Sequence, residues 1–272
     1  MRRKHMGLAR LGLLAMSLML AVKLNAQTPA VAPAAQDPAE ATAADGPVTL
    51  TAKQAKRVHQ ALTDWAQLVR FREDDAKLAP PAAGEQRVVF MGDSITDNWG
   101  RKYGKFFPDK PYVNRGISGQ TTPQMLVRFQ QDVVALHPAA VLILAGINDI
   151  AGNSGSETMA DIEDNFRSMV AIAKREHIRV ILASTLPAST LPWKPSVQPT
   201  EQVRTLNAWL EQYAHDEHLV FCNYYPALVN SSGGIREDLA IDKAVHPNND
   251  GYVLMAPIAE AAITKALVQP RP

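Results

Sequence analysis

The sequence predicts a three-layer α/β fold in which helices cover both faces of a parallel sheet. From Arg87 onward, short apolar segments of strand length alternate five times with longer segments of helical periodicity. Consecutive parallel strands need a crossover connection, which is usually a right-handed helical one, so this alternation is typical of a parallel sheet. The strand-like segments are apolar throughout, as expected where both faces of a sheet are buried.

The first 26 residues have the pattern of a secretory signal peptide. A cationic start, MRRKHMGLAR, precedes the apolar run LGLLAMSLMLAV, which is too short to span a bilayer comfortably. We expect cleavage after Ala26, and the alternative is an uncleaved membrane anchor. The sequence therefore predicts an exported protein, periplasmic or secreted, whose mature chain does not bind a membrane.

Residues 27–50 are rich in alanine and proline and contain almost no large apolar side chain, which is typical of a flexible linker. We then expect an amino-terminal helix over residues 51–80, with Thr51 as its cap. Apolar residues recur along it at spacings of three and four: Ala55, Val58, Leu62, Trp65 and Val69. This stripe predicts a helix that packs against the following domain, or one that pairs two copies into a homodimer.

The main domain is expected over residues 81–272, after Pro80, Pro81 and Gly84 end the helix. Its strands are predicted at 88–91, 112–114, 141–145, 178–183 and 219–222. Its helices are predicted at about 122–136, 157–177, 201–216 and 251–267, each with apolar residues on one face.

Charge and cysteine content restrict the function. Five basic residues and no acidic residue lie in the signal segment, so the rest of the chain carries 23 of the 28 basic residues and all 27 acidic ones. A net charge of about −4 argues against nucleic acid as a partner. Cys222 is the only cysteine, so no internal disulfide can form.

Ser94 is the candidate nucleophile. It follows the first strand by two residues, so its hydroxyl is expected at the carboxyl edge of the sheet, where open α/β folds bind ligands. A serine at this position can also simply cap a helix, so catalysis depends on partners. His246 can remove the serine proton, and Asp242 can orient the imidazole and stabilise its charged form. The sequence thus predicts a catalytic triad of Ser94, His246 and Asp242.

Attack on an ester produces an oxyanion that needs hydrogen-bond donors. We expect three of them: the backbone N–H groups of Ser94 and Gly116, and the side-chain amide of Asn148. Glycine allows a backbone N–H to approach the substrate closely, and asparagine offers uncharged donors. Taken singly, each residue can be explained as a turn or a cap, but together and in this order they favour catalysis.

At these positions the sequence resembles the SGNH, or GDSL-type, esterase family. The family's blocks are matched in order by GDS at 92–94, NRGISG around Gly116, GIND at 146–149 and VHPN at 245–248. The resemblance spans roughly residues 86–267. It implies an SGNH hydrolase domain with a flavodoxin-like sheet, a serine esterase that uses no metal or other cofactor, and the catalytic roles given above. The α/β-hydrolase family is not matched, because Thr96 stands where the second glycine of its G-x-S-x-G motif belongs.

The spacing of acid and base departs from the family pattern. In most relatives the acid lies three residues before the histidine, but here that residue is Lys243, and Asp242 lies four before His246. An insertion of one residue that keeps Asp242 as the acid is the simplest interpretation. The alternative is a dyad in which a backbone carbonyl orients His246.

Two further features lie near the expected site. Trp193, in a proline-rich loop, could stack on a sugar or cover the acyl pocket, or simply anchor the loop. Asp93, Asp97 and Asp149 suggest a competing paired-carboxylate hydrolase, although Asp93 and Asp149 are more simply explained as braces of the two turns.

We therefore predict an exported serine esterase that removes a short acyl group, most simply acetyl, from a carbohydrate or similar polar substrate. Lysophospholipase, arylesterase or thioesterase activity is the alternative within the same family resemblance. A catalytically silent glycan-binding protein is the alternative outside enzymes.

Overall fold

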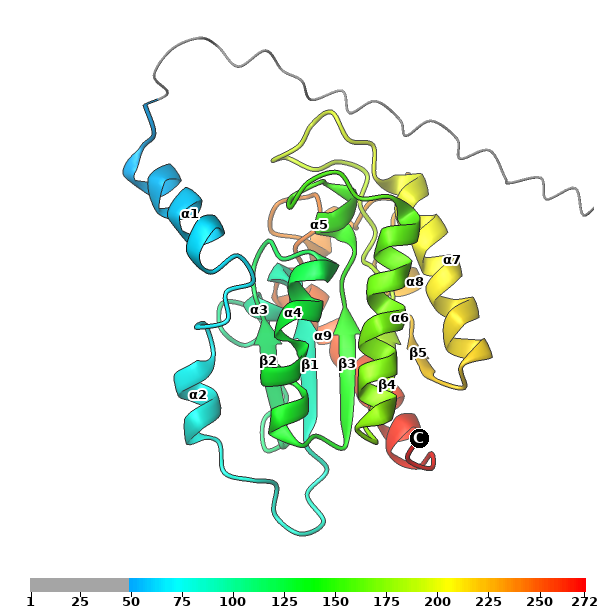
Figure 1. The fold of residues 1–272 in the computed structure, drawn as a ribbon. Coiled ribbons are helices and arrows are strands. Elements are labelled where there is room, and N and C mark those ends of the chain that lie inside the picture. The colour runs from blue at the N-terminus through cyan, green and yellow to red at the C-terminus, as the bar shows by residue number, and fades with distance from the viewer. Residues whose placement is uncertain (1–48) are drawn as a thin grey trace, which may run out of the picture. The chain divides into compact units, whose positions relative to one another are not determined.

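The computed structural model describes residues 49–272, which are built on a five-stranded parallel sheet (Figure 1). The predicted signal peptide, and the predicted linker as far as residue 48, lie outside the described residues. The strand order is β2-β1-β3-β4-β5. The strands are β1 (Val88–Gly92), β2 (Tyr112–Gly116), β3 (Ala140–Leu144), β4 (Arg179–Ala183) and β5 (Val220–Cys222). The predicted fold class and all five predicted strands are confirmed.

The register brings the carboxyl ends of the first three strands to one level. Gly92, the last residue of β1, is paired with Gly116 of β2 on one side and with Leu144 of β3 on the other. The turns that follow these strands therefore leave the sheet side by side, which is the arrangement that the predicted site requires.

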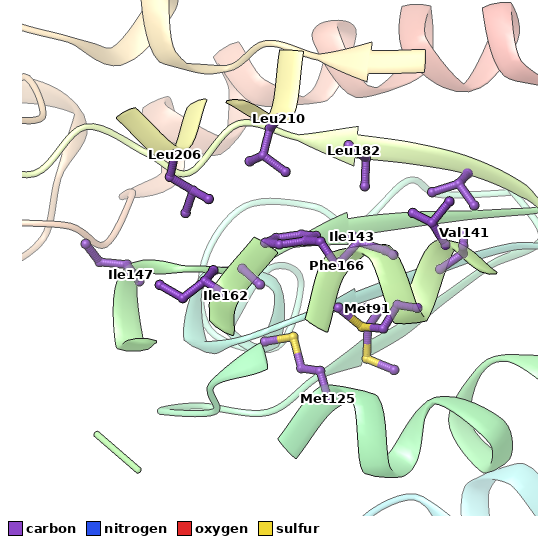
Figure 2. Close-up of a cluster of buried hydrophobic side chains, with 14 of the residues drawn as sticks. Met91, Met125, Val141, Ile143, Ile147, Ile162, Phe166, Leu182, Leu206 and Leu210 are labelled. Carbon is purple, nitrogen blue, oxygen red and sulfur yellow. The ribbon is translucent and has the colours of Figure 1, made fainter. Parts of the chain in front are cut away.

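Three helices cover one face of the sheet: α4 (Thr122–Asp132), α6 (Met159–Arg175) and α7 (Thr200–Asp216). Alternate strand residues point to this face, because side chains of a strand alternate between its two sides. Figure 2 shows Phe166 of α6 and Leu206 of α7 among the strand residues Ile143 and Leu182. All four of these side chains are buried, so this face is a continuous apolar core.

The opposite face is covered mainly by α9 (Asn249–Leu267), which lies behind the sheet in Figure 1. Here Phe90 of β1 packs in an aromatic cluster with Trp99, whose ring centroid is 5.1 Å from that of Tyr252 on α9. The Tyr252 hydroxyl donates a 2.7 Å hydrogen bond to the carbonyl of Ile95 in α3 (Ser94–Asn98). These contacts fix α3, which begins at the candidate nucleophile, against α9.

The prediction of a single amino-terminal helix over residues 51–80 is wrong. The chain forms α1 (Ala52–Thr63) and α2 (Arg72–Lys77), with a turn between them. The Asp64 carboxylate ends α1, because it accepts hydrogen bonds from the N–H groups of Leu68 at 2.7 Å and Val69 at 3.2 Å. Thr51 caps α1 as predicted.

The apolar stripe of this segment does not pack against the main domain as expected. Leu62 is 82% exposed and Val69 59% exposed. The turn itself is anchored: Phe71 is buried, and the Arg115 guanidinium lies 4.7 Å from its ring centroid. Three glutamine side chains of the α4 region also donate to carbonyls of the turn, namely Gln120 to Ala66, Gln124 to Trp65 and Gln131 to Leu68. The carboxyl end of α1 is therefore tied to α4.

The other predicted helices are confirmed within a few residues, except that α4 stops at Asp132 and a short 3-10 turn, η1 (Val134–Leu136), follows it. Three short elements complete the chain: α5 (Ile147–Ile150), α8 (Tyr225–Leu228) and η2 (Glu237–Leu239). Within residues 49–272, no helix is long and apolar enough to cross a membrane.

Candidate active site

Ser94 is the first residue of α3, directly beyond the end of β1. Its Oγ lies 2.9 Å from Nε2 of His246, a residue 152 positions further along the chain. The helix begins here because Asp93 caps it, accepting the N–H of Ile95 at 2.9 Å. The N–H of Ser94 donates to no acceptor in the described part of the chain. The serine thus presents both a hydroxyl beside an imidazole and a free N–H.

His246 is held by Asp242. Nδ1 of His246 lies 2.5 Å from Oδ2 of Asp242, and Oδ1 of the same carboxylate accepts the N–H groups of Ala244, Val245 and His246 at 3.0 to 3.1 Å. The structure therefore brings together the three residues of the predicted triad. Glu237 and Asp238, the other acids nearby in sequence, pair with Lys243 and Arg236 instead.

The environment of Asp242 stabilises its ionised form. Partial burial raises the pKa of this carboxyl, but the hydrogen bond to His246 and those from the three N–H groups outweigh burial and hold the pKa well below its usual value. Asp242 is consequently an anion throughout the pH range in which an imidazole can act as a base.

The prediction that Gly116 supplies an N–H to the oxyanion is wrong. The Gly116 N–H donates to Oδ1 of Asn114 at 2.9 Å, and the residue does not line the cavity beside Ser94. A Cβ at position 116 would lie 2.2 Å from the backbone nitrogen of Asp97. The residue is glycine because α3 packs directly on the end of β2.

Gly119, three residues later, takes the place expected of Gly116. It lines the cavity, its φ is +83°, and no atom lies within 4 Å of the position of a Cβ there. Among the described residues, no acceptor takes its N–H. The signal for it was present in the sequence as the second glycine of NRGISG, but spacing alone does not distinguish a packing glycine from one at a binding site.

Asn148 lines the same cavity as predicted and is 3% exposed. Its Nδ2 donates to the carbonyl of Gln120 at 3.0 Å and lies 3.3 Å from Oδ2 of Asp93. Its Oδ1 accepts a 2.8 Å hydrogen bond from Nδ2 of Asn153. The amide group is therefore fixed with its nitrogen on the side of Asp93.

Asn153 also reaches Trp193. Nε1 of Trp193 donates to Oδ1 of Asn153 at 3.1 Å, and the indole lies 6.2 Å from the His246 ring, centroid to centroid. Asn153 thus joins the proline-rich loop to the side chain of Asn148. No pattern in the sequence identified Asn153, because a polar residue in a turn is unremarkable without its partners.

The two buried carboxyls brace the turns, as expected. Burial raises the pKa of Asp93 to about 6, although the Ile95 N–H and the nearby His246 oppose the rise. Burial likewise raises the pKa of Asp149 to about 8; hydrogen bonds from Thr122 oppose this and Glu157 adds to it. Asp149 accepts the N–H of Thr122 at 2.7 Å and so connects the turn after β3 to α4. None of Asp93, Asp97 and Asp149 lines the cavity, so a paired-carboxylate mechanism has no support in this geometry.

A buried ion pair holds the ends of β1 and β2. Arg128 of α4 is fully buried and donates to the carbonyl of Gly92 at 3.1 Å, to that of Arg115 at 2.8 Å and to Asp132 at 3.0 Å. Burial lowers the pKa of Arg128 to about 10, and Asp132 opposes this. Sequence reasoning missed both residues, because charged residues on a helix normally face solvent.

The site occupies a cavity of about 670 Å³. Its lining residues are Arg57, Ser94, Asn98, Lys102, Ser118, Gly119, Asn148, Asn153, Trp193, Ile241 and His246. A second cavity of about 750 Å³, between residues 104–110 and α9, contains no pair of nucleophile and base. In residues 49–272, no three His, Cys, Asp or Glu side chains gather to hold a metal ion, and burial raises the pKa of the Cys222 thiol to about 12.

Comparisons with known proteins show the family to which this chain is similar. The sequence model of the GDSL-like lipase/acylhydrolase family matches residues 90–254. A Bacteroides fragilis crystal structure assigned as an acylhydrolase is 42% identical, with a TM-score of 0.73 over 75% of this chain and 99% of that one. A GDSL-like lipase structure from Bacteroides thetaiotaomicron is 40% identical, with a TM-score of 0.72 over 75% and 100%.

An acetylxylan esterase of Xylanibacter ruminicola is 26% identical over 241 residues, which are 75% of this chain. The chain spans only 46% of the length of that relative.

Proposed function

Because the chain belongs to the GDSL-like lipase/acylhydrolase family and carries the fold of a serine carboxylic ester hydrolase, we propose that it hydrolyses an ester with Ser94 as the nucleophile. The observation that carries this proposal is the 2.9 Å contact between Ser94 Oγ and Nε2 of a histidine that Asp242 orients. A hydroxyl, a base and an anion in this order are the elements of nucleophilic acyl transfer.

In the proposed reaction, Ser94 Oγ attacks the ester carbonyl while Nε2 of His246 takes the hydroxyl proton. Asp242 stabilises the imidazolium that forms. The oxyanion accepts hydrogen bonds from the N–H groups of Ser94 and Gly119, with Gly119 in place of Gly116. The amide of Asn148 becomes the third donor when its Nδ2 exchanges the 3.3 Å contact with Asp93 for the oxyanion. His246 then protonates the leaving alcohol, and an acyl group remains on Ser94. Water, deprotonated by His246, attacks this acyl group and releases the carboxylic acid and the free serine.

We further propose that the acyl group is short, most simply acetyl, and that the alcohol is a carbohydrate or a similarly polar compound. Two large apolar side chains line the cavity, Trp193 and Ile241, and both are more than 40% exposed. A long acyl chain would need a continuous apolar wall instead. The similarity to an acetylxylan esterase supports the same choice. In this proposal Trp193, whose ring centroid is 6.2 Å from that of His246, contacts a sugar ring of the substrate.

Export and dimerisation remain proposals from the sequence. The cationic and apolar start of the chain supports export to the periplasm or the medium. The exposed apolar stripe of α1 is compatible with a homodimer. No partner other than the ester substrate is needed for the proposed reaction, and no metal or other cofactor enters it.

The test is hydrolysis of p-nitrophenyl acetate, butyrate and octanoate by the purified protein and by Ser94→Ala. Loss of activity in the variant, together with a preference for acetate, supports the short-acyl esterase. A preference for octanoate favours the lysophospholipase alternative. Equal slow turnover by both proteins contradicts catalysis and favours a glycan-binding protein.

A further inference from the structure

The charged side chains that line the cavity are cationic. They are Arg57 and Lys102, and no aspartate or glutamate lines it. Neither cation forms an ion pair within the described part of the chain. The nearest acid in sequence, Asp97, is engaged by Arg101 and Arg70. The cavity therefore attracts anions, although the chain as a whole is close to neutral.

An amide without partners lies at the same wall. Asn98 lines the cavity and is 6% exposed, and its Oδ1 is buried without a hydrogen bond. Its Nδ2 also makes no hydrogen bond to the described protein. An amide without partners is unfavourable at a buried position. The Nδ2 of Asn98 can donate a hydrogen bond to a ligand in the cavity, whereas the buried Oδ1 can only accept one.

Arg57 lies outside the residues that the family model matches. It lies on α1, whereas the family match begins at residue 90. The glutamine contacts to the turn after α1 hold this helix near α4. Of the two cations, Arg57 therefore lies outside the residues that the family model matches, and Lys102 lies within them.

We propose that Arg57, Lys102 and Asn98 form a subsite for a carboxylate of the substrate, so that the enzyme deacylates a glycan containing a uronic acid. This inference rests on the proposed esterase function. A guanidinium binds a carboxylate with two parallel hydrogen bonds, and an ammonium adds a compact positive charge. The polar lining favours a sugar acid over an anionic lipid, because only Trp193 and Ile241 offer large apolar contact.

The test uses two substrates that differ in one group: acetylated methyl glucuronoside and acetylated methyl glucoside. We expect the ratio of their kcat/KM values to be about ten in favour of the uronate at low salt, since a charged hydrogen bond is commonly worth about this factor. The ratio should fall with added salt because ions screen the attraction. Arg57→Gln and Lys102→Gln should each lower the ratio of kcat/KM values, and the double variant should bring this ratio near one. Arg57→Lys should keep part of the preference for the uronate.

Lys56→Gln is the matched control. Lys56 is the exposed neighbour of Arg57 on α1 and does not line the cavity, so its loss should leave the ratio unchanged. Ser94-dependent hydrolysis of both sugars with a ratio of one in the unaltered protein overturns the subsite. If the enzyme prefers acetylated glycerol phosphate over acetylated glycerol more strongly than it prefers the uronate over the glucoside, the subsite binds a phosphate. This result would overturn the proposal of a carboxylate.

A binding measurement separates the subsite from the catalytic proposal. Glucuronic acid and glucose are titrated into Ser94→Ala by calorimetry or NMR. The subsite is supported if glucuronic acid binds more tightly than glucose and if Arg57→Gln weakens the binding of the acid. This result counts even if no ester is hydrolysed. Equal binding of both sugars, or no effect of Arg57→Gln, overturns it. Absence of Ser94-dependent hydrolysis of any ester contradicts the proposed function instead.

Discussion

Asp242 lies four residues before His246, and its Oδ2 is nevertheless 2.5 Å from Nδ1 of the histidine. Lys243 makes this contact possible. Its φ of +54° turns the backbone, which accommodates the additional residue between the acid and the base. Its side chain leaves the site and pairs with Glu237 at 2.9 Å. The spacing thus alters a surface turn and leaves the contact between acid and base intact.

Asp242→Asn should lower kcat by about a thousandfold or more, because an amide neither holds the required tautomer nor stabilises the imidazolium. Glu237→Gln is the control and should retain kcat, since that carboxylate faces Lys243. The measurement is ester hydrolysis with thermal unfolding beside it. Near-normal activity of Asp242→Asn would favour the dyad.

Lys243→Gly should retain activity and relieve about 1 kcal/mol of left-handed strain.

The two glycines of the NRGISG block should respond differently to alanine. Gly116→Ala should lower the unfolding temperature markedly, because the Cβ would meet the backbone of Asp97. Gly119→Ala has space for its Cβ but a φ of +83°, so we expect a stability loss of about 1–2 kcal/mol and a disproportionate loss of kcat. Unfolding curves and kcat measured on both variants separate the effects. A loss of kcat in Gly116→Ala with unchanged stability would reverse the assignment.

Asn153→Ala should lower kcat about tenfold by releasing the amide of Asn148, which it holds at 2.8 Å. Trp193→Phe removes the donor to Asn153 but keeps an aromatic ring, so its kcat should fall less and its KM for a sugar ester should change more. If the variants and the unaltered protein unfold at the same temperature, the loss of kcat reflects a changed position of Asn148 and not a general loss of stability. If Asn153→Ala changes KM alone, it does not act through Asn148.

Asp149 should make the protein less stable as pH rises. Its pKa in the folded protein is about 8, whereas an unfolded aspartate has a pKa near 3.9, so the folded state binds the extra proton. This contribution is complete below about pH 4 and is lost on the way to pH 8, at no more than about 1.4 kcal/mol per pH unit. The raised pKa of Asp93 likewise makes the protein less stable as the pH rises to about 6.

Asp149→Asn should flatten the dependence of unfolding free energy on pH between about 6 and 8, where Asp93 no longer contributes. Asp164→Asn, at an exposed site on α6, is the control and should keep the slope. The measurement is urea unfolding at a series of pH values. An identical slope in Asp149→Asn and the unaltered protein would mean that Asp149 is ionised in the folded state.

The strands could be predicted because local patterns determine them, and the contacts among Ser94, His246 and Asp242 because these residues follow strand ends. An apolar run that ends in glycine marks a central strand, and strand ends in a parallel sheet meet at one edge, so Ser94 and His246 were expected together. Gly116 was assigned wrongly because two glycines three residues apart differ only in what packs against them. Arg57 was missed because its neighbours in space are distant in the chain, and Asn153 because a polar residue in a turn is unremarkable without its partners. The helix break at Asp64 depended on side-chain capping, which an apolar periodicity does not report.

The buried pair of Arg128 and Asp132 gives the last prediction. Both side chains are 0% exposed, and the guanidinium also satisfies the carbonyls at the ends of β1 and β2. Arg128→Met should destabilise the protein by about 3–5 kcal/mol, because it leaves Asp132 buried without a counter-charge. The double variant Arg128→Met/Asp132→Leu should recover much of this loss, since no uncompensated charge remains. Arg204→Met, in an exposed pair with Glu201, should cost about 1 kcal/mol or less. Urea unfolding measures the stability of all three variants. If the double variant is no more stable than Arg128→Met, the carbonyl contacts of Arg128, rather than its charge pairing, hold the ends of the two strands.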